Sequence, residues 1–209
     1  MKPILVEPFD RTHLLDRVRQ TRLRGFDRRQ VYRDAVVELT PPTSTDAFTP
    51  AQNYVLRPTV DTILALRANL LDEGIDLFAL DGGAHVRMQD NPDEVVPVIP
   101  PVVEESREPD GRTVLVVNDG LHRLFAARSV GLPISVVLIR DVPPDCPYYA
   151  YALRDGWSQV AELDELPDTH QKKEYRVPGN YKALFRDFNE QFPGVQKQRK
   201  RSNPAHISE

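Results

Sequence analysis

Five consecutive residues, Asp119 to Arg123, place chemically capable side chains where a strand is expected to turn into a helix. The preceding run, 113–117, is rich in Val and typical of a buried strand, and Asp119-Gly120 is a turn dipeptide. A helix that begins after Gly120 would gather backbone N–H groups, an imidazole and a guanidinium at its N-terminus. Such a terminus attracts anions through its N–H groups and its dipole. The pattern therefore predicts a phosphate site at residues 119–123.

The side chains of this site have different candidate roles. Arg123 can make charge-assisted hydrogen bonds to a polyphosphate, and His122 can donate to the transferred group or orient it. Asp119 is the candidate ligand for Mg²⁺, because a carboxylate beside phosphates lets the ion bridge them. Gly120 and Leu121 complete the predicted phosphate loop. The structural alternatives are a turn or capping role for Asp119, its ion pair with Arg123, and a hydrogen-bonded helix-start role for His122.

A partial echo of this pattern occurs at Asp81-Gly82-Gly83-Ala84-His85. The two glycines could form a loop that approaches phosphate closely, although such a pair is more commonly a plain turn. Asp81 and His85 are therefore possible site residues. Trp157 could stack on a base, but a packed anchor is the commoner role of a tryptophan.

Composition limits the classes of protein to which the chain can belong. Its net charge of −4 over 209 residues argues against a protein that coats nucleic acid through overall charge. The single cysteine, Cys146, excludes an internal disulfide and a thiolate zinc cluster. No apolar stretch approaches the roughly 20 residues that span a bilayer, and the start of the chain does not resemble a signal peptide. We expect a cytoplasmic protein without a membrane partner.

Periodicity and turn residues predict the elements that hold the site. A helix is strongly indicated from Pro58 to Gly74, where apolar residues share one face. Strands are expected at 36–40, 95–103, 113–117 and 134–139, with a polar turn at 105–112 and a second helix at about 121–130. This order of elements indicates a mixed α/β fold.

Both ends of the chain have their own character. Residues 1–33 contain a basic stretch with partial helical periodicity, either a solvated helix with one buried edge or a helix that faces phosphate or nucleic acid. Residues 143–195 carry aromatic side chains at helical spacing, which predicts a helical extension packed on the core rather than a ligand-binding box. Residues 196–209 form a basic tail that we expect to be disordered. Its positive charges at 197–201 and those at 11–33 could contact nucleic acid.

The Asp119-Gly120-Leu121-His122-Arg123 box is followed by a small-residue pair, Ala126-Ala127, by Gly131 and by another expected strand. In this order of features, residues 34–142 resemble the ParB/sulfiredoxin-like superfamily. The stretch from Val98 to Val142 matches it in spacing, and the helix at 58–74 lies where the family has its preceding helix. The resemblance implies an α/β (α+β) fold, with a small mixed sheet and packed helices.

The resemblance also implies a phosphate site at the box. ParB proteins hold the phosphates of CTP with it, sulfiredoxins use it with ATP, and a group of ParB-like enzymes uses an Asp-Gly-x-His-Arg version to phosphorylate free serine. The last version is closest to this chain. Leu121 stands where sulfiredoxins have a nucleophilic cysteine, which argues against sulfinic acid reduction. The short aromatic segment after the box does not resemble the helix-turn-helix domain of ParB partition proteins, which argues against a partition role.

The function we expect is therefore binding of nucleotide phosphates, with ATP or another nucleoside triphosphate and Mg²⁺ as cofactors. It would extend to magnesium-dependent phosphoryl transfer to an unidentified small-molecule acceptor, or to nucleotide hydrolysis. In the serine-kinase relatives a glutamate from the N-terminal part of the domain is the base, and by position Glu38 is the candidate here. One alternative is a nucleic-acid-associated accessory protein or nuclease of a mobile-element or defence system. Another is a scaffold protein whose site has decayed.

Overall fold

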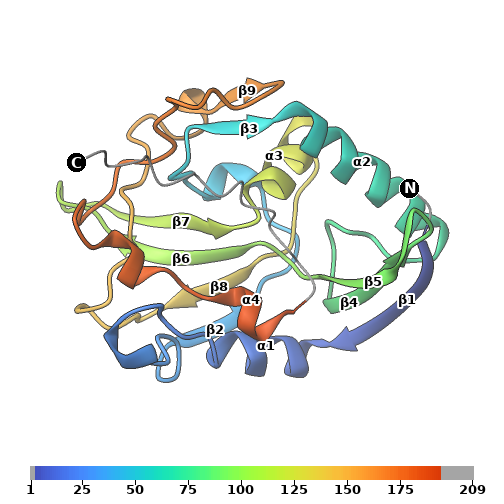
Figure 1. Cartoon of the computed structure of the whole chain (residues 1–209), viewed down its shortest axis with the longest axis horizontal. Helices are drawn as coiled ribbons and strands as arrows, with labels where there is room; N and C mark the ends of the chain where they lie inside the picture. Colours follow the sequence, from blue (N-terminus) through green and yellow to red (C-terminus); the bar gives the residue numbers. More distant parts are fainter. Residues whose placement is uncertain (1–2, 194–209) are drawn as a thin grey trace, which may run out of the picture.

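The computed structural model describes residues 3–193 (Figure 1). These residues contain a four-stranded, a three-stranded and a two-stranded sheet together with four helices. The strands are β1 (Pro3–Asp10), β2 (Val36–Leu39), β3 (Tyr54–Leu56), β4 (Gly82–Met88), β5 (Asn91–Val98), β6 (Val102–Arg107), β7 (Thr113–Asp119), β8 (Val137–Arg140) and β9 (Ala161–Leu163). The helices are α1 (Arg11–Arg19), α2 (Arg57–Asp72), α3 (Leu121–Ser129) and α4 (Phe188–Gln191). The mixed α/β class predicted from the sequence is confirmed.

The four-stranded sheet, in the order β2-β8-β6-β7, carries the 119–123 box at the end of its edge strand. Strand β6 is antiparallel to β7 and parallel to β8. An apolar edge strand would expose unpaired backbone groups. Thr49 covers this edge, since its N–H donates to the Leu115 carbonyl at 2.8 Å and its carbonyl accepts from the Val117 N–H at 3.0 Å. Because β6 extends to Arg107, the turn predicted at 105–112 is confined to 108–112.

Helices α2 and α3 pack on each other and carry the main core. Their bounds confirm the two predicted helices to within about two residues at each end. The small-residue pair Ala126-Ala127 is fully buried on α3 and belongs to the same cluster as Leu70 of α2. Figure 1 shows α3 beside the end of β7 and α2 above β4 and β5. Helix α3 is therefore held against α2 through its small-residue face.

The glycine pair Gly82-Gly83 lies in the three-stranded sheet, whose order is β1-β4-β5, so the predicted turn or phosphate loop at this pair is wrong. Gly82 and Gly83 open β4 and are not part of a turn or a phosphate loop. A Cβ on Gly83 would lie 2.2 Å from the ring of Phe9 on β1, so this glycine permits the two strands to approach closely. The start of the chain thus shares a sheet with residues 82–98, which periodicity alone does not predict.

The predicted helix in the basic segment is shorter than expected. It forms α1 over Arg11–Arg19, and residues 20–35 continue as turns and short bridges. Three consecutive residues in this stretch, Phe26 to Arg28, adopt left-handed backbone conformations with φ between 51° and 58°. Helix α1 has already ended at Arg19, and the left-handed residues lie in the turn between the bridged residues Arg22 and Gln30.

The C-terminal extension packs on the core but is much less helical than its aromatic spacing predicts. After residue 143 it contains β9, two short 3-10 turns at Gly156–Gln159 and Tyr181–Leu184, and the four-residue helix α4. Leu184 and Phe192 are buried, as expected for an extension laid on the core. No helix within residues 3–193 combines the length and the apolarity needed to cross a bilayer.

The segment boundaries predicted at residues 34, 142 and 195 remain predictions. The basic tail, residues 196–209 with its cluster at 197–201, lies outside the described residues.

Candidate functional site

A cavity of about 500 Å³ lies at the N-terminus of α3. One wall is the box itself together with Asn118, and a second is formed by α2 and by residues 97–99 at the end of β5. The third wall comes from residues 185–192 of the C-terminal extension. Ligand sites of proteins commonly have volumes of about 300–1,000 Å³, so the cavity is large enough for a small molecule.

Gly120 shapes the box by its backbone conformation. Its φ is +84°, in the left-handed region, and it is the residue from which α3 begins. A Cβ at this position would lie 2.9 Å from Arg123 Nη2 and 2.9 Å from the Cβ of Pro101. Only glycine therefore fits here without strain, and its absent side chain leaves room for the guanidinium of Arg123.

Arg123 is held against the cavity wall by two contacts. Its Nη2 lies 3.1 Å from Asp119 Oδ2, and its Nη1 donates to the carbonyl of Ile99. The side chain is 18% exposed. Burial lowers the pKa of Arg123 from its ordinary value and the Asp119 carboxylate opposes this shift, so the guanidinium stays charged. The predicted ion pair between Asp119 and Arg123 exists, and both residues also line the cavity.

His122 connects the start of α3 to the start of α2. The backbone N–H of Leu56, the residue before α2, donates to His122 Nε2 at 3.0 Å. Because Nε2 accepts this hydrogen bond, the neutral ring carries its proton on Nδ1. Thr59, in the first turn of α2, lines the same cavity. Two helix N-termini therefore border one cavity, and both favour negative charge there.

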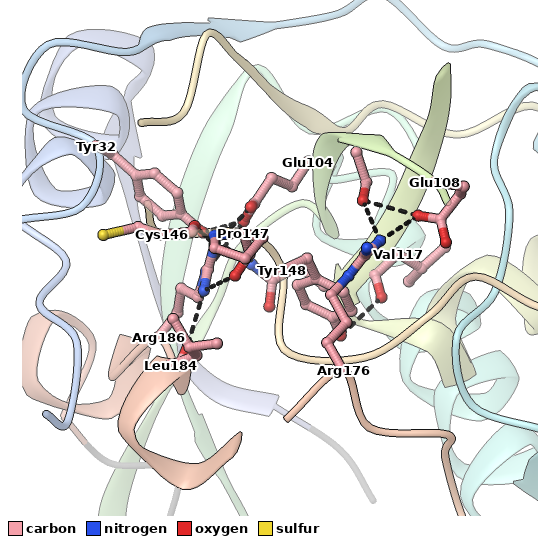
Figure 2. Close-up of polar contacts among 12 residues, drawn as sticks. Tyr32, Glu104, Glu108, Val117, Cys146, Pro147, Tyr148, Arg176, Leu184 and Arg186 are labelled. Carbon is pink, nitrogen blue, oxygen red and sulfur yellow. Dashed lines mark hydrogen bonds and ion pairs between the residues drawn. The ribbon is translucent and has the colours of Figure 1, made fainter. Parts of the chain in front are cut away.

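A buried ion pair ties the box to the C-terminal wall (Figure 2). Arg186 Nη2 lies 2.6 Å from Glu104 Oε1, and the two side chains are 0% and 1% exposed. Glu104 also accepts from the Tyr32 hydroxyl at 2.8 Å and from Asn118 Nδ2 at 3.2 Å. Asn118 directly precedes Asp119. The carboxylate of Glu104 thus contacts one residue of each wall.

Arg186 is further fixed by the backbone around it. Its guanidinium donates to the carbonyls of Cys146 at 2.8 Å, Pro147 at 3.0 Å and Leu184 at 2.7 Å (Figure 2). Burial by itself lowers the pKa of Arg186, but Glu104 and Tyr32 together outweigh burial and raise the pKa above its ordinary value. The pair is therefore ionised, and its hydrogen bonds satisfy a buried charge that would otherwise be costly.

The C-terminal wall combines aromatic rings with a basic residue. Phe185 and Phe188 are half-buried and line the cavity, as does Arg24, whose guanidinium lies 5.5 Å from the centroid of the Phe185 ring. Tyr149 also lines it and accepts a hydrogen bond from Lys173 Nζ at 2.6 Å. Burial raises the pKa of Tyr149, but the charge and hydrogen bond of Lys173, together with Tyr148 and Arg186, outweigh burial and lower the pKa.

The structure brings together only part of the predicted site. Asp119, Gly120, Leu121, His122 and Arg123 all line the cavity.

The other candidates lie elsewhere. Glu38 forms an ion pair with Arg140 at 3.0 Å on β2 and β8. Asp81 pairs with Arg11 at 2.6 Å, and the ring of His85 packs 5.0 Å from that of Phe9. None of these three candidates lines the cavity.

Trp157 is a packed anchor, as the commoner alternative predicts. Its Nε1 donates to the Thr45 carbonyl at 3.0 Å, and its ring packs on Phe125 and Arg128.

The residues that sequence reasoning missed are Asn118, Arg24 and the rings at 185 and 188. Their signals are the adjacency of Asn118 to the box, the basic stretch that contains Arg24, and the aromatic spacing, which indicates core packing.

The described residues contain no preformed set of metal-binding side chains. Within residues 3–193 no group of three or more His, Cys, Asp or Glu side chains is arranged to hold a metal ion. Magnesium is commonly bound by one or two carboxylates together with substrate phosphates and water. The single carboxylate of Asp119 therefore suffices as the protein ligand of a magnesium ion that is bound to a nucleotide.

Comparison with known families gives one match. The family model described as the ParB CE domain matches residues 13–161. The match includes the box and the helices around it and ends before the C-terminal wall at 185–192. No curated protein matches the chain.

Proposed function

The chain belongs to the ParB CE domain family, and on this premise we propose that its cavity binds the phosphates of a nucleoside triphosphate. The observation that carries the proposal is the convergence of two helix N-termini and the guanidinium of Arg123 on a single cavity. Helix N-termini attract phosphate through their N–H groups and dipoles, and arginine adds charge-assisted hydrogen bonds. The left-handed Gly120 is the structural requirement for this arrangement.

In the proposed complex, Arg123 and the first turn of α3 hold phosphate oxygens. Asp119 would hold a magnesium ion, which neutralises phosphate charge and polarises the group to be transferred. His122 would border the phosphates from the first turn of α3, with its ring oriented by the hydrogen bond that Nε2 accepts from the Leu56 N–H.

Phosphoryl transfer to a small-molecule acceptor, or to water, extends this proposal. Such reactions depend mainly on positioning and on electrostatic stabilisation of the phosphoryl group, which these three residues could supply. Glu38 takes no part in the proposal, because it pairs with Arg140 and does not line the cavity.

Titration of the full chain with ATP, CTP and GTP, with and without Mg²⁺, tests the proposal. A ligand present at 100 times its Kd should stabilise the folded protein by about 2.7 kcal/mol, which thermal unfolding detects. Arg123→Ala should abolish this stabilisation, whereas Arg140→Ala, an arginine outside the cavity, should retain it. The proposal fails if no nucleotide stabilises the protein, or if the two arginine variants respond alike.

A second candidate function, association with nucleic acid, is favoured by a basic hollow on the surface. A cavity of about 420 Å³ is lined by Arg22, Arg28, Arg29 and Arg33. Asp27 and Asp34 line the same hollow, and three of the four charges are partly offset, since Arg29 pairs with Asp145 at 2.6 Å, Arg28 with Asp187 at 3.3 Å and Arg33 with Asp34 at 3.9 Å. Binding of DNA or RNA through this hollow should weaken steeply with salt. Absence of binding at low salt would exclude this function.

A further inference from the structure

The wall of the cavity opposite the box belongs to a part of the chain that the family match does not cover. The match ends at residue 161, whereas this wall is formed by residues 185–192. Its side chains differ in chemistry from the box, because Phe185 and Phe188 present aromatic rings and not hydrogen-bond donors. One half of the cavity is thus polar and suited to bind phosphate, and the other half is aromatic.

The two rings are held in fixed positions. The Phe185 ring packs edge-to-face on Tyr149, with centroids 4.7 Å apart and an interplanar angle of 67°. The Phe188 ring lies nearly parallel to Tyr32, with centroids 6.2 Å apart and an angle of 28°. Both rings are half-buried and line the cavity. An aromatic surface that is already fixed loses little entropy when a flat ligand stacks on it.

The segment that carries the rings is fixed relative to the box. Its backbone pairs with residues 22–24, since the Arg24 N–H donates to the Phe185 carbonyl at 3.0 Å and the Asp187 N–H donates to the Arg22 carbonyl at 2.9 Å. The side chain of Arg186, between the ring positions, is buried against Glu104 at 2.6 Å. The aromatic wall is therefore part of the folded core and not a loose flap.

We propose that Phe185 and Phe188 form a nucleobase subsite, which stacks the base of a nucleotide whose phosphates occupy the box. The inference rests on the proposed function and deepens it, because it names the residues that would hold the base of the nucleotide, outside the part of the chain that the family match covers. A nucleotide carries the two chemistries that the cavity presents, an anionic end and a flat aromatic end. Every base has a stacking face, and the exposed amide of Asn189 beside the rings can both donate to and accept from a base edge.

Comparison of a nucleotide with a base-free polyphosphate tests the subsite directly. Binding of ATP, CTP and GTP and of inorganic tripolyphosphate, each with Mg²⁺, would be measured by calorimetry on the full chain. Phe185→Leu and Phe188→Leu keep apolar volume but remove the ring, so each should weaken binding of the preferred nucleotide about five- to tenfold. Binding of tripolyphosphate should remain unchanged. Phe125→Leu makes the same change in a half-buried phenylalanine outside the cavity and should leave both ligands unaffected.

A second variant covers the case in which removal of a ring disturbs folding. Asn189 is exposed, so Asn189→Ala should fold normally and should weaken binding of the nucleotide a fewfold without affecting tripolyphosphate. Thermal unfolding of each variant shows whether it is folded.

The outcomes separate this inference from the proposed function. If the wild-type protein binds tripolyphosphate as tightly as every nucleotide, the base subsite is overturned and the phosphate site stands. Equal weakening of both ligands by the ring variants, or no weakening of either, also overturns the subsite. If the wild-type protein binds neither ligand, the proposed function itself fails.

Discussion

Substitution of Gly120 by Ala tests whether the box depends on its glycine. The φ of +84° at Gly120 costs an L residue roughly 1–2 kcal/mol. The added Cβ would also lie 2.9 Å from Arg123 Nη2 and 2.9 Å from the Cβ of Pro101, so one of these neighbours must move. Overpacking of this kind typically costs about 1–3 kcal/mol. The two effects together predict that Gly120→Ala lowers the free energy of unfolding by about 2–5 kcal/mol.

Gly74 provides a matched control for this substitution. Its φ is +78°, close to that of Gly120, but a Cβ there would meet nothing within 4 Å. Gly74→Ala should therefore lose only the conformational part, about 1–2 kcal/mol. Urea unfolding of the two variants and the wild-type protein, analysed at constant m-value, measures the difference.

The same pair of variants connects stability to the site. In Gly120→Ala the guanidinium of Arg123 must shift, so stabilisation by a nucleotide with Mg²⁺ should be strongly reduced. In Gly74→Ala it should equal that of the wild-type protein. Equal losses of stability in the two variants would refute the crowding argument. Unaltered nucleotide binding by Gly120→Ala would refute the claim that Gly120 makes room for Arg123.

Three further predictions concern the charges and the thiol. Glu104→Gln should destabilise the protein by about 3–5 kcal/mol in urea unfolding, because it leaves Arg186 buried without its counter-charge; a loss below 1 kcal/mol would contradict the buried pairing. Arg67 lowers the pKa of Asp76, so the stability that Asp76 contributes is present above about pH 4 and is lost as the pH falls through the depressed pKa. Stability measured from pH 7 to pH 2 should therefore fall less in Asp76→Asn than in the wild-type protein, and identical profiles would contradict this. Burial raises the pKa of the Cys146 thiol, which is 0% exposed, so a thiol reagent should modify it only after urea unfolding; rapid labelling of the native protein would show that the site opens.

The strand–turn–helix unit around the box could be predicted because its signals are local. A Val-rich run, an Asp-Gly turn and a helix that ends near Gly131 specify β7 and α3 without knowledge of the rest of the chain. The same holds for α2, whose apolar face and closing Gly74 indicate its length. Local signals fail for residues 20–35, which keep the basic character of α1 but form turns and short bridges after that helix ends at Arg19.

Features that depend on distant pairing could not be predicted in this way. Gly82 and Gly83 form a strand because β1 lies beside them, and the pair alone has the character of a turn. Glu38 is a candidate by position only. Its partner is Arg140, about one hundred residues away in the chain, which lies diagonally across from it because the register of β2 and β8 places Arg140 opposite Val36. The aromatic wall shows the same limit. Its spacing indicates packing, but the cavity between it and the box exists only after residues 22–24 and 184–187 have paired.

The buried pair of Glu104 and Arg186 has a role that its stability does not explain. A buried ion pair contributes little net free energy compared with an apolar pair of similar size, because desolvation offsets the attraction. The pair does provide directional hydrogen bonds. One carboxylate accepts from Asn118, beside the box, and from Arg186, in the aromatic wall. An apolar pair could fill the same volume without fixing these two partners relative to each other. The two halves of the cavity belong to different parts of the chain, and Glu104 is the residue through which their spacing is set.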